Sequence, residues 1–148
     1  MAPVRKDTMQ LVIRNELADL AIASESLERF CARHGVAREP LVQLQVALDE
    51  IASNVIKYAW PEGGTHEFTI HFTADGNGVT IEIMDDGQPF DPCNAPAPKR
   101  TGGRRRPGGA GIPMTKQLMD DIEYIRARGT NHIKLTKRCA THIAVEEK

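Results

Sequence analysis

Three polar residues, Glu50, Asn54 and Lys57, could carry chemistry because they recur at helical spacing within the stretch 40–59. At about 100° per residue they fall roughly 180–240° from Leu48, on the face opposite an apolar stripe. A carboxylate one turn from an amide oxygen can place a base beside a metal ligand, and a lysine one turn further can meet phosphate. Mg²⁺ prefers oxygen ligands and keeps several waters, so one amide plus phosphates would suffice. A solvated polar helix face is the plainer interpretation, and this row alone decides nothing.

A second polar group, Asp85, Asp86 and Gly87, follows a strand expected to end at Ile83. A carboxylate can only accept hydrogen bonds. Asp85 would therefore favour a base with an exocyclic amine, such as adenine, over guanine, which has an oxygen at that edge. Gly87 would let a backbone approach closely. The alternative is an ordinary turn at the end of a strand, where Asp-Gly pairs are common.

A third group is the glycine-rich turn Gly108, Gly109, Ala110 and Gly111, directly before a predicted helix. The free N–H groups and the dipole at a helix N-terminus form an anion site. The chain has neither a GxxxxGK[ST] motif nor a GxGxxG motif after a strand. A glycine turn by itself is therefore a weak indication of phosphate binding.

The helices that would position these groups are predicted by apolar residues at a spacing of three and four. The first is expected over 16–34, capped by Asn15, and the second over about 40–59, with a proline tolerated in its first turn. A short helix is expected over 111–119. The clearest core stripe lies on the second helix and consists of Leu41, Leu44, Leu48, Ile51 and Val55.

Strands are predicted where apolar and polar residues alternate. They are expected over 9–14, 68–72, 79–83, 121–128 and 132–138. A turn at Asp75–Gly78 joins the second and third of these into a hairpin. Because hairpin-joined strands are combined with helices bunched in sequence, we predict an α+β fold. It is a two-layer sandwich with helices on one face of a mostly antiparallel, mixed sheet.

The composition favours one globular domain over residues 1–148, with 41% hydrophobic and 26% charged residues. A net charge of −1 gives no reason to expect direct nucleic-acid binding or an anionic membrane as partner. No apolar stretch reaches the length of a signal peptide or a membrane span. The three cysteines, Cys31, Cys93 and Cys139, form no CxxC pair and are odd in number. We therefore expect a reduced, cytoplasmic protein.

Taken in order, the three groups resemble the N, G1 and G2 boxes of the GHKL (Bergerat-fold, histidine kinase-like) ATPase superfamily. The matching segments are E-I-A-S-N-V-I-K-Y at 50–58, D-D-G-Q-P at 85–89 and G-G-A-G-I at 108–112. The chain most resembles the stand-alone bacterial anti-sigma factor serine/threonine kinases, over nearly its whole length. The resemblance implies a kinase that uses ATP and Mg²⁺, phosphorylates an anti-anti-sigma (STAS) partner and sequesters a sigma factor.

The resemblance also implies roles for the helix residues of the first box. Glu50 would be the general base that deprotonates the attacking hydroxyl or water. Asn54 would ligate Mg²⁺. Lys57 would lie near the phosphates, and Tyr58 could flank the nucleotide.

For the other boxes, the resemblance implies that Asp85 reads the adenine amine with Gly87 beside it. Gly109 and Gly111 would hold the phosphate end, and Thr130 would lie near the base. The segment between the second and third boxes, about 86–108, would be a mobile ATP lid. Its Arg104–Arg106 run either contacts γ-phosphate or is solvated, and the sequence leaves this open.

Two alternatives to a kinase acting on a partner are a histidine-kinase catalytic domain and a non-catalytic ATP-binding module. A histidine-kinase catalytic domain normally shares its chain with a helical dimerisation domain, which we do not expect before the first strand. A non-catalytic ATP-binding module would control a partner by lid position alone, and a base at Glu50 argues against it. In the nearest relatives the first helix presents a basic residue to partners, whereas 21–26 has none. The partner's identity and the number of subunits, a homodimer included, therefore stay open.

Overall fold

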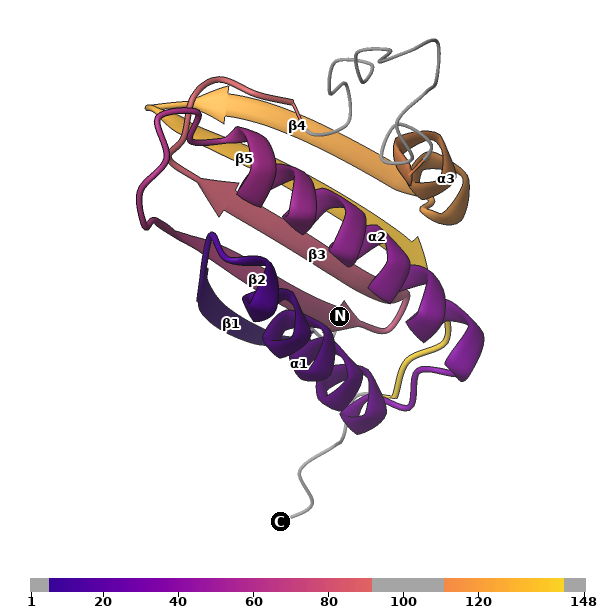
Figure 1. The fold of residues 1–148 in the computed structure, drawn as a ribbon. Coiled ribbons are helices and arrows are strands. Elements are labelled where there is room, and N and C mark those ends of the chain that lie inside the picture. The colour runs from indigo at the N-terminus through magenta and orange to yellow at the C-terminus, as the bar shows by residue number, and fades with distance from the viewer. Residues whose placement is uncertain (1–5, 92–110, 143–148) are drawn as a thin grey trace, which may run out of the picture.

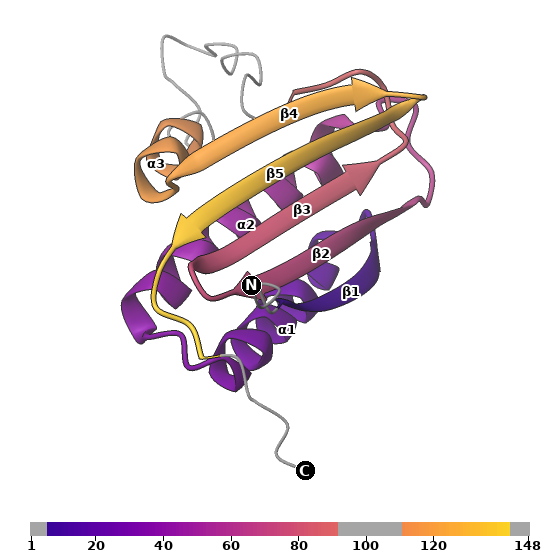
Figure 2. The same ribbon diagram turned by 180° about the vertical axis from the view of Figure 1, so that it is seen from behind.

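The computed structural model describes residues 6–91 and 111–142, with the backbone alone for 111–114. Within these residues five strands form one sheet in the order β1-β2-β3-β5-β4, and each neighbouring pair is antiparallel. The strands are β1 (Lys6–Arg14), β2 (Glu67–Asp75), β3 (Gly78–Asp85), β4 (Asp121–Ala127) and β5 (Thr130–Arg138). All described helices lie on one face (Figure 1), and Figure 2 shows the other face of the sheet. The predicted α+β sandwich is confirmed.

The helices are η1 (Leu17–Asp19), α1 (Leu20–Arg33), α2 (Arg38–Tyr58) and α3 (Gly111–Leu118). α1 and α2 pack side by side over the sheet, and α3 packs against α2 near the start of β4 (Figure 1). No helix among the described residues is long and apolar enough to span a membrane.

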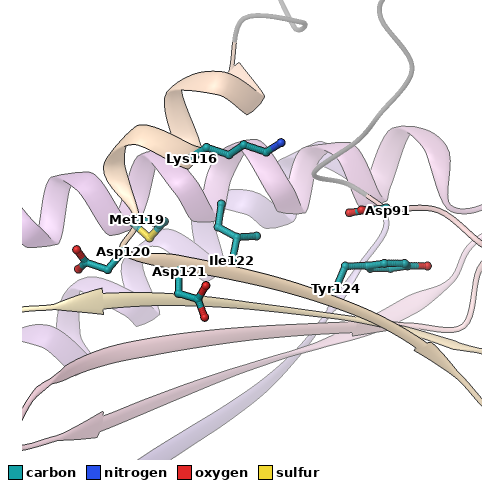
Figure 3. A pocket seen from close by; sticks show the side chains of 7 residues that line it. All are labelled: Asp91, Lys116, Met119, Asp120, Asp121, Ile122 and Tyr124. Atoms are coloured by element: carbon teal, nitrogen blue, oxygen red, sulfur yellow. The ribbon is translucent and has the colours of Figure 1, made fainter.

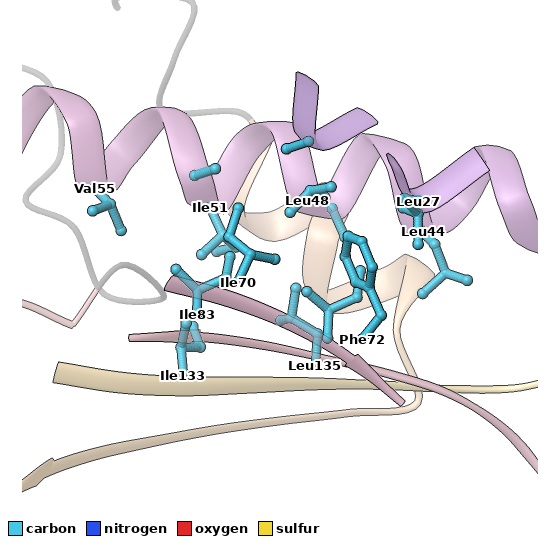
Figure 4. Close-up of a cluster of buried hydrophobic side chains, with 14 of the residues drawn as sticks. Leu27, Leu44, Leu48, Ile51, Val55, Ile70, Phe72, Ile83, Ile133 and Leu135 are labelled. Atoms are coloured by element: carbon cyan, nitrogen blue, oxygen red, sulfur yellow. The ribbon is translucent and has the colours of Figure 1, made fainter. Parts of the chain in front are cut away.

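The predicted stripe on α2 forms the centre of the core. Four of its residues, Leu44, Leu48, Ile51 and Val55, are at most 1% exposed, while Leu41 is only partly buried. They face side chains from the inner face of the sheet (Figure 4), including Ile70, Phe72, Ile83, Ile133 and Leu135. Because this stripe must face the sheet, it also fixes which side of α2 carries the polar row.

Asn15 does not cap the first helix, so that prediction is wrong. Its backbone N–H donates to the His66 carbonyl at 2.9 Å, and its Oδ1 accepts from the His66 N–H at 2.8 Å. Its Nδ2 donates to the Gly64 carbonyl at 3.0 Å. The α-helix begins only at Leu20, after η1. The Asn15 side chain therefore bonds to the segment just before β2, whereas the local sequence pattern predicts that it caps a helix.

The single tryptophan, Trp60, lies just after α2 and is 7% exposed. Its ring stacks on His66, with centroids 4.6 Å apart and planes 2° from parallel. Trp60 therefore packs against the core just beyond the end of α2.

We predict that Ile51→Ala lowers the free energy of unfolding by about 2–5 kcal/mol, because it removes a fully buried side chain. Val46→Ala is the matched control on the same helix. Val46 is 37% exposed, so its truncation should change stability by less than about 0.5–1 kcal/mol. Chemical denaturation measures both, and equal losses would contradict the assignment of the α2 core face.

Candidate functional site

Asp85 ends β3 as a buried carboxylate, 4% exposed. Its Oδ1 accepts hydrogen bonds from the Gly87 N–H and from Nδ2 of Asn131, each at 2.9 Å. Among the described residues both bonds converge on Oδ1, and neither uses Oδ2. The protein therefore fixes the orientation of this carboxylate through one of its two oxygens.

Burial raises the pKa of the Asp85 carboxyl above its ordinary value. The hydrogen bonds from Asn131 and Gly87 and the Arg126 guanidinium oppose this rise, and the neighbouring Asp86 carboxylate adds to it. Because burial is the larger effect, holding Asp85 in its charged form costs folding free energy. Perturbed carboxylates of this kind are concentrated at functional sites.

Asn131, 2% exposed, links Asp85 to three other residues, two in the loop after β3 and one on β4. Its Nδ2 donates to Oδ1 of Asp85 and, at 2.8 Å, to the Gln88 carbonyl. Its Oδ1 accepts from the Tyr124 hydroxyl at 2.6 Å and from the Phe90 N–H at 3.2 Å. A side-chain amide has two donor hydrogens and two acceptor lone pairs, so all four are used.

Sequence reasoning proposed Thr130 and missed Asn131. Side chains alternate along a strand, so Thr130 belongs to the sheet face opposite the one that Asn131 shares with Ile133 and Leu135. Thr130 nevertheless lines a small hollow, about 240 Å³, together with Asp85. The alternation was a usable signal, because an asparagine in phase with two core residues needs buried hydrogen-bond partners.

Gly87 brings the chain after β3 into contact with the end of α2. A Cβ at this position would lie 2.3 Å from the Ala59 carbonyl oxygen, too close for any side chain. The Gln88 N–H donates to that same carbonyl, and its Nε2 donates to the Tyr58 carbonyl, both at 2.7 Å. From β4, Arg126 donates to the Gly87 carbonyl at 2.8 Å. The fold itself therefore requires glycine here.

The predicted polar row of α2 is not a uniformly solvated face. Asn54 is 5% exposed, Glu50 is half-buried and Lys57 is exposed. Tyr58 is 36% exposed and packs beside Phe90, with ring centroids 5.5 Å apart. α3 packs against α2, and this tertiary contact could not be foreseen from the periodicity of α2.

A hollow of about 350 Å³ lies between α3 and β4 (Figure 3). It is lined by Asp91, Lys116, Met119, Asp120, Asp121, Ile122 and Tyr124. In this view the Lys116 side chain extends from α3 in the direction of Asp91. Sequence reasoning did not single out Lys116 or Tyr124. Because the Tyr124 hydroxyl contacts Asn131, the hollow is connected to the network around Asp85.

The predicted phosphate end of the site is described only in part. Gly111 is the first residue of α3, so a glycine does lead into this helix. Gly109, the Arg104–Arg106 run and the predicted lid beyond residue 91 lie outside the described residues. Before that point, Gly87, Gln88 and Phe90 are hydrogen-bonded to the end of α2, to β4 and to β5.

Comparison with known families supports the inferred resemblance. The model of the histidine kinase-like ATPase domain matches residues 13–137, which include α2, the end of β3 and the Asn131 network. This chain belongs to the histidine kinase-like ATPase domain family. The superfamily predicted from the three motifs is confirmed.

Curated relatives of this ATPase-domain protein are named as protein kinases. The serine/threonine-protein kinase BtrW of Bordetella bronchiseptica is 29% identical over 140 residues, covering 92% of this chain and 96% of the relative. The serine-protein kinase RsbW of Listeria monocytogenes is 26% identical over 138 residues, covering 89% and 86%. The RsbW of Bacillus subtilis is 22% identical over 137 residues, covering 88% and 85%.

A solved structure, the RsbU and RsbW domains of Rv1364c from Mycobacterium tuberculosis, matches this ATPase domain with a TM-score of 0.64. The match covers 93% of this chain at 14% sequence identity. This chain spans 35% of that longer chain. At this identity the likeness shows the fold alone.

We predict that Asp85→Asn is at least as stable as the wild type in neutral solution, because it removes a buried charge. The folded pKa of Asp85 is raised, so the native state binds the proton more tightly than the unfolded state. Wild-type stability should therefore fall as pH rises from the unfolded pKa of Asp85 through its folded pKa. The amide of the variant does not titrate in this pH range. The excess of its free energy of unfolding over that of the wild type should therefore grow as pH rises from the unfolded to the folded pKa of Asp85. Denaturation at several pH values measures it, and an advantage that shrinks as pH rises would be inconsistent.

Proposed function

We propose that this chain binds ATP with Mg²⁺ and transfers the γ-phosphate to a serine or threonine hydroxyl of a STAS-type partner. We further propose that it sequesters a sigma factor. The main observation in favour of ATP binding is that the Asp85 carboxylate is buried and held in one orientation by hydrogen bonds. The names of the relatives, serine-protein kinases, support transfer to a protein.

Asp85 would recognise the base through Oδ2, the oxygen not used by the two internal hydrogen bonds. A carboxylate accepts from the exocyclic amine of adenine and repels the O6 of guanine. Tyr58, beside Phe90, would flank the nucleotide, and Thr130 would lie near the base from the start of β5. Gly87 would contribute to nucleotide binding indirectly, because the absence of a side chain lets the loop after Asp85 contact the end of α2.

The phosphate end would be formed by Gly109 and Gly111 at the start of α3, with Lys57 near the phosphates. Asn54 would supply an amide oxygen to Mg²⁺, and a buried amide beside a half-buried carboxylate suits a hard cation. When bound, the metal would neutralise charge on the phosphates. The remaining ligands would be phosphate oxygens and water.

Glu50 would act as general base on the attacking hydroxyl. Its half-buried carboxylate lies one turn before Asn54 on the same helix, so base and metal ligand keep a fixed separation. Phosphoryl transfer needs positioning and electrostatic stabilisation more than covalent chemistry from the protein, and a rigid helix supplies both. A non-catalytic nucleotide-binding module remains the alternative, and it differs only in whether Glu50 matters.

We predict that Asp85→Asn weakens ATP binding by about 1–3 kcal/mol, because the amide replaces an acceptor that would pair with the adenine amine. Calorimetric titration of the full chain with Mg-ATP measures this. Asn77→Asp, an exposed amide-to-carboxylate exchange in the β2–β3 turn, controls for a general effect of charge. Unchanged affinity in Asp85→Asn would remove Asp85 from base recognition.

We predict that Glu50→Ala keeps most nucleotide affinity but transfers phosphate about 10²–10⁴-fold more slowly, as expected for loss of a general base. Asn54→Ala should lose both binding and transfer through the metal. Partners are first recovered from the native organism with ATP and with ADP, and transfer to them is then followed. Recovery of a STAS protein and a sigma factor that exchange with nucleotide is expected.

The matched control for this experiment is Glu39→Ala, an exposed glutamate in the first turn of α2. Melting curves accompany each variant, because Asn54 is buried and its truncation also affects packing. Wild-type transfer by Glu50→Ala would favour the non-catalytic module.

A further inference from the structure

The Asn131 amide can adopt only one orientation in its network. Its Nδ2 faces two acceptors, Oδ1 of Asp85 and the Gln88 carbonyl. Its Oδ1 faces two donors, the Tyr124 hydroxyl and the Phe90 N–H. Rotation by 180° would set Oδ1 against two acceptor oxygens and Nδ2 against the Phe90 N–H. Three of the four bonds would be lost, because among these partners only the Tyr124 hydroxyl can both donate and accept. A hydrogen-bond donor is therefore always directed at Asp85.

The hydrogen bond from Asn131 opposes the effect of burial on the pKa of Asp85. Burial raises the pKa of that carboxyl, and the hydrogen bond from Asn131 is the first of the interactions that oppose the rise. If the donor is removed, the Gly87 N–H is the only hydrogen-bond donor left on Oδ1 among the described residues. The balance between a charged and a protonated carboxyl thus depends on the residue at position 131.

The two protonation states of Asp85 would recognise different purines. The carboxylate offers an acceptor at Oδ2, which suits a 6-amino purine. A protonated carboxyl can offer an O–H donor there, which suits a 6-oxo purine. We propose that Asn131 is a positioning residue that keeps Asp85 an acceptor and so makes the site select 6-amino over 6-oxo purine nucleotides. The inference rests on the proposed function, because it concerns the same nucleotide site.

The charged and titratable groups around Asp85 come from several elements. From β4, the Arg126 guanidinium favours the carboxylate, and Tyr124 acts through its bond to Asn131. Asp86, next in the chain, disfavours the carboxylate. Glu67 of β2 lines the same small hollow as Asp85. Only Asn131 and Gly87 hydrogen-bond the carboxylate directly among the described residues.

The test is calorimetric titration of the full chain with ATP and with ITP, the 6-oxo counterpart, across a pH series. Both ligands carry the same ribose and triphosphate, so the affinity ratio cancels the titration of the phosphates. In the wild type ATP should bind at least about tenfold more tightly at neutral pH, the value of one good hydrogen bond. The preference should weaken as pH falls and Asp85 takes up a proton.

Asn131→Leu removes the donor while keeping a similar side-chain volume. Its ATP-to-ITP preference should fall about tenfold at neutral pH and recover as pH rises. A purely structural role for Asn131 would weaken both nucleotides equally and leave the ratio unchanged, which would overturn the proposal. Asn77→Asp in the β2–β3 turn should keep the wild-type ratio.

Asn131→Asp covers the case in which the leucine variant does not fold, because it keeps an oxygen for Tyr124 and Phe90. Two facing carboxyl groups share one proton below the upper apparent pKa of the pair, which restores a donor toward Asp85. ATP binding should survive where the pair holds that proton and decline as pH rises and the proton leaves, unlike in the wild type. A wild-type pH profile in this variant would contradict the proposal.

A nucleotide-free measurement separates this inference from the proposed function. NMR titration of the ¹³C-labelled Asp85 carboxyl should show a higher midpoint in Asn131→Leu than in the wild type, or a shift of the pair's titration in Asn131→Asp. An unchanged midpoint would overturn the role of Asn131 whether or not the chain binds nucleotide. Failure of the wild type to bind ATP, with the midpoint shifted as expected, would instead count against the proposed function.

Discussion

The contact of Gly87 with Ala59 determines how the parts of the candidate site relate to one another. At a distance that admits no Cβ, the chain leaving β3 lies directly on the last residues of α2, and Gln88 fixes it there through two backbone carbonyls. The carboxylate at the end of β3 therefore has a defined position relative to the polar row of α2. The core stripe of α2 sets the rotation of the helix, so that this row faces away from the sheet.

Side-chain hydrogen bonds from the β4–β5 hairpin hold the loop after β3 a second time. Asn131 and Arg126 reach from β5 and β4 to residues 85–90 with side-chain hydrogen bonds. Such a buried network stabilises one arrangement only when each member is satisfied, because an unmet buried polar group is costly. Three elements distant in sequence thus meet around one carboxylate, and the hollow against α3 lies next to them.

Local sequence patterns predicted the parts of this fold that depend on period alone. The sequence correctly predicts the strands β2, β3 and β5 from their alternation, and the core face of α2 from its apolar stripe. Burial of one face of a strand or helix places apolar residues at regular intervals in the sequence. Asn15 was misassigned, because its partners lie on another strand and a cap signal contains no information about them. The burial of Asn54 could not be predicted either, because the periodicity of α2 contains no information about what covers its polar face. The three motifs predict a site on α2, at the end of β3 and before α3, whereas finding Asn131 required the register of β5.

The position of Trp60, stacked on His66 next to the end of α2, makes its fluorescence informative. The chain contains one tryptophan, and it directly follows the residue whose carbonyl receives the Gln88 N–H. Its fluorescence therefore comes from a single place, the joint between α2 and the loop after β3, with no second indole to dilute the signal. A change in emission wavelength or lifetime would report on that joint and on the stack with His66, without any label. The protein carries its own spectroscopic probe beside the site where the base would be read.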